Sequence, residues 1–79
     1  MSGKHPPLTS REVKRGLKIL GFEFRTQKGS HEQWIKDKDG KRYKVTVDCP
    51  KEPFSADLIT SMASQAGVSK KDFYIACRD

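Results

Sequence analysis

The sequence predicts a small two-layer α+β domain in the order helix, three antiparallel strands, helix and short helix. Near both ends of the chain, apolar residues recur every three or four positions, as in amphipathic helices. Between these regions they alternate with polar residues, as in strands, and an Asp-Gly turn interrupts the alternation. A three-stranded sheet needs one covered face, which the two longer helices can provide. We therefore expect the other face of the sheet to be open to solvent.

The chain is long enough for one domain, since it has 79 residues. Residues 1–7 are polar and contain two adjacent prolines, which predicts a flexible tail before a single domain over residues 8–79. A catalytic group needs a fixed position, so we expect no chemical role for His5 in this tail.

The first helix is predicted to begin at Thr9, because Thr9-x-x-Glu12 fits a capping box, and to end at Gly21. Gly16 inside it costs about 1 kcal/mol relative to alanine. Either a close packing contact requires this glycine or the helix is locally weak. The apolar residues of one face are Val13, Leu17 and Leu20. The basic residues lie mostly on the remaining faces and are Arg11, Lys14, Arg15 and Lys18.

Three strands follow. In the first, the alternation predicts one face carrying Phe22, Phe24 and Thr26. A short connection at residues 28–30 leads to a second strand over residues 31–36, and Asp39-Gly40 forms the hairpin turn before a third strand over residues 42–48. Within the second strand, His31 and Trp34 face opposite sides, and we expect Trp34 to be a core residue.

Two helices complete the chain. Pro50 and Pro53 end the third strand, since proline cannot donate to a ladder. Ser55 is predicted to cap a helix that ends at Gly67, and Ser69 repeats the capping pattern before a short last helix.

Charge favours a polyanionic partner, because 16 Lys and Arg residues against 10 Asp and Glu residues give a net charge of +6. No apolar run approaches the roughly 20 residues that span a bilayer, so we expect a cytoplasmic protein without a membrane contact. Cys49 and Cys77 do not have metal-site or disulfide-framework spacing, and both are expected to be reduced.

His31 is the candidate catalytic residue, because it follows a basic, glycine-containing turn. A neutral imidazole can take the proton of a ribose 2′-hydroxyl, and nearby cations can stabilise a phosphorane. The turn offers backbone N–H groups, a hydroxyl and a cation, as a phosphate-holding turn does. The candidate RNA- or phosphate-binding residues in and beside it are Arg25, Lys28, Gly29, Ser30 and Lys44.

Three other interpretations of His31 are possible from the sequence. A surface histidine satisfied by a backbone carbonyl would have no chemical role. A metal site lacks ligands, because the other histidine lies in the tail and the cysteines are far apart in sequence, so no metal or cofactor is expected. A serine nucleophile lacks an evident acid to orient the histidine, although Glu32 or Asp48 could approach it in three dimensions.

The chain also resembles the HicA toxin family. The resemblance covers Ser10 to Phe73 and rests on Gly21-Phe22, Gln27-Lys28-Gly29-Ser30-His31, Asp39-Gly40 and Gln65-Ala66-Gly67, in that order after a helix. It implies a fold like that of a double-stranded-RNA-binding domain, order α-β-β-β-α with a short C-terminal helix. It also implies the toxin of a type II toxin–antitoxin system, an mRNA interferase with His31 catalytic, an mRNA substrate and a HicB-like antitoxin as partner.

The chain departs from the family pattern after its third strand, where a proline and a further histidine are often found. Here that stretch reads Asp48-Cys49-Pro50-Lys51-Glu52-Pro53. The leading hypothesis is a metal-independent endoribonuclease with a single catalytic histidine. The alternatives are a non-catalytic RNA-binding module of the same fold and a domain that binds an acidic protein.

Overall fold

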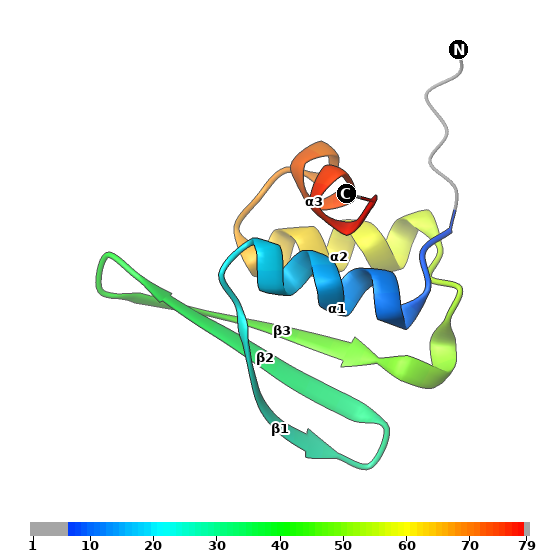
Figure 1. Ribbon diagram of the computed structural model, residues 1–79, viewed down its shortest axis with the longest axis horizontal. Coiled ribbons are helices and arrows are strands. Elements are labelled where there is room, and N and C mark those ends of the chain that lie inside the picture. The colour runs from blue at the N-terminus through cyan, green and yellow to red at the C-terminus, as the bar shows by residue number, and fades with distance from the viewer. Residues whose placement is uncertain (1–6, 79) are drawn as a thin grey trace.

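The elements of the computed structural model, which describes residues 7–78, follow the predicted order (Figure 1). They are α1 (Ser10–Ile19), β1 (Glu23–Lys28), β2 (His31–Lys38), β3 (Lys41–Asp48), a 3-10 turn (Cys49–Lys51), α2 (Ala56–Ala66) and α3 (Lys70–Arg78). The α+β class and the order that resembles a double-stranded-RNA-binding domain are confirmed. His5 and the rest of residues 1–6 lie outside the described residues.

Side-chain caps fix where the helices begin. The Thr9 hydroxyl accepts a hydrogen bond from the backbone N–H of Glu12, and the Glu12 carboxylate accepts one from the backbone N–H of Thr9. The predicted capping box is therefore present. Ser55 and Ser69 cap α2 and α3 by accepting the backbone N–H of the residue three positions on. Each cap satisfies a backbone donor that the first helical turn leaves without a partner.

α1 and α3 are packed closely together at Gly16. A Cβ atom built on Gly16 would lie 2.5 Å from the Sγ atom and 2.9 Å from the Cα atom of Cys77. Cys77 is fully buried, and burial raises the pKa of its thiol to about 12. Of the two explanations for this glycine, close packing is therefore the one that the structure bears out.

The three strands form an antiparallel sheet in the order β1-β2-β3. β1 pairs Phe24 with Trp34 but Thr26 with Gln33, so Arg25 is an extra residue at an irregularity of the register. The predicted common face of Phe24 and Thr26 is therefore wrong. A bulge shifts the alternation by one residue, and it leaves Phe24 on the helix side, edge-on to Trp34 with ring centroids 5.8 Å apart.

The core lies between the helices and the β2–β3 part of the sheet. Trp34 is 4% exposed, which confirms its predicted place in the core. Every residue of β1 is exposed, and the contacts between the helices and the sheet are concentrated on β3. α3 packs on α1 and α2 and lies on their far side from the sheet (Figure 1). No helix among the described residues is long and apolar enough to cross a membrane.

α2 runs beside the outer edge of β3. The Gln65 side-chain oxygen accepts the backbone N–H of Thr46 at 3.1 Å and so occupies a donor on this edge of the sheet. At the start of the domain, Leu8 bridges to Phe54 in the segment that leads into α2. These contacts bring α2 alongside the end of β3, where Asp48 is the last strand residue.

Candidate active site

His31 is the first residue of β2 and follows a tight turn in which Gly29 has a φ of 61°. On one side it pairs with Lys28 of β1, and on the other it pairs with Asp48 of β3. Residues directly opposite each other in an antiparallel pair project to the same face. The cation, the imidazole and the carboxylate therefore lie in a row across one end of the open face.

The imidazole and the carboxylate are in contact. The Nε2 atom of His31 lies 3.2 Å from Oδ2 of Asp48, and the Ser30 hydroxyl donates to Oδ1 of Asp48 at 3.4 Å. The backbone N–H of Cys49 donates to the Ser30 carbonyl at 3.3 Å and ties the turn to the end of β3. The His31 side chain is 53% exposed and that of Asp48 is 26% exposed, so the pair is accessible to a large ligand.

This arrangement suits a histidine that transfers protons. Nε2 makes a close ionic contact with the Asp48 carboxylate rather than a well-aligned hydrogen bond, and Nδ1 is the ring nitrogen that this contact leaves available to a ligand. The carboxylate also stabilises the imidazolium that forms when Nδ1 takes a proton. Ser30 bonds to Asp48 rather than to His31, so the geometry does not support a serine nucleophile activated by this histidine.

Glu32, the other acid that could have approached His31, lies on the helix side of the sheet. Its carboxylate accepts from Lys14 at 3.2 Å, from the Trp34 indole at 3.2 Å and from the Cys49 thiol at 3.5 Å. Burial raises the pKa of Glu32, but the hydrogen bonds from these three side chains together outweigh it, and the pKa lies below its ordinary value. Asp48 is thus the acid that contacts the imidazole.

The candidate phosphate-binding cations are spread along the open face. Lys28 lies beside His31 in the ladder. Lys28 and Lys44 line one shallow hollow, and Lys44 and Arg25 line the next. Lys44 pairs with Ile35, four residues along β2 from His31, which is about 13 Å at ~3.3 Å per residue. The structure therefore brings Lys28 next to the imidazole and places Lys44 and Arg25 farther along the same face.

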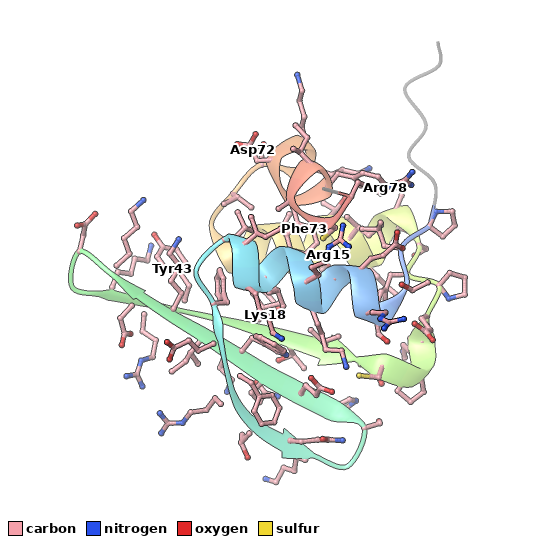
Figure 2. The ribbon with its side chains drawn as sticks, viewed as in Figure 1. Arg15, Lys18, Tyr43, Asp72, Phe73 and Arg78 are labelled. Atoms are coloured by element: carbon pink, nitrogen blue, oxygen red, sulfur yellow. The ribbon has the colours of Figure 1, made fainter. Side chains whose placement is uncertain are left out.

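A second basic surface lies on the other side of the sheet. The α1 basic groove is a hollow between α1 and the β1–β2 hairpin, with Phe24, Glu32 and Trp34 among its lining residues. Its basic residues are Arg11, Lys14, Arg15 and Lys18. Figure 2 shows Arg15 and Lys18 on α1, with Lys18 extending toward the strands. Among the described residues, Lys14 is the one of these four that forms an ion pair, with Glu32.

The remaining groups that could bind a metal or react are the acidic, histidine and cysteine side chains. Within residues 7–78, the His, Cys, Asp and Glu side chains form no group of three or more that could hold a metal ion. Cys49 and Cys77 are both free.

Asp48 could have been found from the sequence through the hairpin turn. Counting outward from Asp39-Gly40, Lys38 pairs with Lys41, and seven further steps on each strand pair His31 with Asp48. The two-residue turn thus contains the signal for the contact, provided that the strands pair without a bulge.

Residues 10–68, more than half of the chain, match the family model described as HicA toxin of bacterial toxin-antitoxin. No curated protein and no solved structure matches the chain significantly.

Proposed function

The chain belongs to the HicA toxin family, and from this membership we propose that it is a metal-independent endoribonuclease that cleaves mRNA, with His31 as its catalytic residue. HicA proteins are toxins of toxin–antitoxin systems and are known as a ribonuclease-type family. The observation that carries the proposal for this chain is the exposed His31 imidazole, held by Asp48 at 3.2 Å beside Lys28.

The proposed reaction is an intramolecular transesterification, in which the ribose 2′-oxygen attacks the adjacent phosphodiester. The Nδ1 atom of His31 takes the proton of a ribose 2′-hydroxyl, and the 2′-oxygen attacks the adjacent phosphorus. The bond from phosphorus to the 5′-oxygen of the next nucleotide breaks, and that oxygen receives the proton from the imidazolium. The products are a 2′,3′-cyclic phosphate and a 5′-hydroxyl. Lys28 and the backbone N–H groups of Gly29 and Ser30 offset the charge on the phosphorane.

The proposed protein partner is a cognate antitoxin that resembles HicB. The open face, with Lys28, Lys44 and Arg25, is the surface that an antitoxin must cover to keep RNA from His31. We place the toxin in the cytoplasm, where its mRNA substrate is found.

The test is cleavage of a mixed-sequence RNA by the purified full chain in excess EDTA. The His31→Ala variant should lose activity, and His5→Ala, which removes the other histidine of the chain, should cleave like the parent. Circular dichroism establishes that each variant is folded, and end analysis should find cyclic phosphates.

Undiminished cleavage by His31→Ala would exclude the proposed catalytic role. If the folded parent binds RNA in a salt-sensitive way but never cuts it, the chain is a non-catalytic RNA-binding module.

A further inference from the structure

A hollow of about 140 Å³ lies between the end of β3 and α2, next to the His31–Asp48 pair. Its apolar floor includes Phe54 and Met62, which are 2% and 5% exposed, together with the half-buried Leu58. Asp48 forms part of its wall. The residue whose carboxylate contacts the imidazole therefore also borders the hollow.

The rim of the hollow carries polar groups from one face of α2. The Gln65 oxygen is engaged by the backbone N–H of Thr46, which leaves the amide NH₂ as a donor. The Ser61 hydroxyl makes no hydrogen bond to another residue in the described part of the chain, and it can donate or accept. Lys51 adds a cation at the mouth. The hollow thus combines an apolar floor, edge groups of both hydrogen-bonding kinds and a positive charge.

These features fit a flat heteroaromatic ring with polar edges and an attached phosphate, as in a nucleotide. The volume limits the ring size, because an apolar protein cavity of roughly 150 Å³ holds one benzene molecule. A single six-membered ring fills the hollow, whereas a bicyclic purine would extend into solvent.

We infer that this hollow binds the pyrimidine base of the nucleotide next to the cleaved bond, an inference that rests on the proposed ribonuclease function. The ring lies on Phe54, Leu58 and Met62, and its polar edge meets Ser61 and Gln65. A base seated there places its ribose at the side of the hollow where Asp48 contacts His31. The hollow therefore selects which phosphodiester bond is presented to the imidazole.

Filling the hollow tests this inference. Ser61→Phe adds a ring at the exposed rim position, and Ser64→Phe adds the same ring at an exposed position of α2 that does not line the hollow. The parent and both variants, as full chains, are titrated with cytidine 3′-monophosphate, adenosine 3′-monophosphate and ribose 5-phosphate, and backbone amide shifts are followed by NMR.

The cytidine nucleotide should shift the amides of residues 58–65 in the parent and bind at least fivefold more tightly than the adenosine nucleotide. Ser61→Phe should weaken cytidine binding at least fivefold, and Ser64→Phe should change it less than twofold. On mixed-sequence RNA, the parent should cut next to pyrimidines and Ser61→Phe should lose that preference.

The results separate this inference from the proposed function. Pyrimidine binding in the hollow by a protein that does not cut RNA supports the base site and contradicts the ribonuclease. Absence of shifts at residues 58–65 overturns the base site even if RNA is cleaved. Equal binding of the adenosine nucleotide overturns the choice of pyrimidine, and equal shifts with ribose 5-phosphate overturn base recognition altogether.

Discussion

His31 and Asp48 are direct cross-strand neighbours whose side chains meet at 3.2 Å across β2 and β3. Their register is continuous with the two-residue turn at Asp39-Gly40, in which both residues have positive φ. A slip of one residue would move one of the two side chains to the opposite face of the sheet. The contact at one end of the hairpin therefore depends on the turn at its other end.

Asp48→Asn should slow RNA cleavage without unfolding the protein. The amide has nearly the same shape but cannot stabilise an imidazolium as a carboxylate does, so we expect a loss of about 10²-fold, within the range for general acid–base groups. Single-turnover cleavage between pH 5 and 8 measures the effect. Asp39→Asn is the matched control, because it makes the same change in the hairpin turn, where asparagine also tolerates positive φ. Parental rates in Asp48→Asn at every pH would exclude this role.

Gly16→Ala should destabilise the fold, although alanine favours helix by about 1 kcal/mol. The added Cβ would lie within 2.9 Å of the Cys77 backbone, and overpacking of this kind costs about 1–3 kcal/mol. Urea denaturation should show a lower free energy of unfolding, whereas Ser64→Ala on the exposed face of α2 should not.

A second variant tests the cause of that destabilisation. Adding Cys77→Ala to Gly16→Ala removes the Sγ contact at 2.5 Å but leaves the contacts to Cα and N, so the rescue should be partial. An unfolding free energy of Gly16→Ala at or above that of the parent would mean that α1 and α3 do not approach this closely.

The sequence predicted those parts of the fold that local chemistry determines. The capping box at Thr9 and the turn at Asp39-Gly40 are set by neighbouring residues, and both are present. The bulge at Arg25 was missed, because a period-two pattern assumes that each strand residue has one partner.

The candidate site was predicted in part. The turn before His31 indicates this histidine, whereas Asp48 as its partner requires the register of β2 and β3, which sets the two residues opposite each other. Glu32 follows His31 directly in sequence and so lies on the other face, whereas Asp48 lies opposite His31 in the ladder. The hollow beside α2 was not predicted, since it arises from the packing of a helix against a sheet edge.

Glu32→Gln should lower the free energy of unfolding at neutral pH more than at low pH. The folded pKa of Glu32 lies below its ordinary value of 4.5, because its hydrogen bonds outweigh burial. Its contribution is therefore fully present above the unfolded pKa and is lost as the pH falls through the folded value. Denaturation measured from pH 3 to 7 should show that the difference in unfolding free energy between the parent and the variant shrinks below about pH 4.5.

The control for this pH dependence is Glu23→Gln, which changes an exposed carboxylate on β1. It should shift stability little at any pH. A gap between the parent and Glu32→Gln that stays constant down to pH 3 would show that the Glu32 carboxylate is not stabilised in the folded protein.

RNA should bind along the open face rather than along the α1 basic groove. Two double charge reversals separate these surfaces, Lys28→Glu with Lys44→Glu on the open face and Arg11→Glu with Arg15→Glu in the groove. Both change the net charge equally, so a general electrostatic effect is matched. The His31→Ala background prevents cleavage during the binding measurement.

Each phosphate contact to a single strand contributes about 0.7 to the slope of log K against log salt concentration. Loss of Lys28 and Lys44 should therefore flatten that slope by about 1.4, while the groove variant should change it much less. Fluorescence anisotropy with a labelled single-stranded RNA gives both slopes. The reverse result would place the RNA over Phe24 and Trp34, on the side of the sheet opposite His31, where the imidazole could not reach it. Binding and cleavage would then require different faces, so this comparison also bears on the proposed reaction.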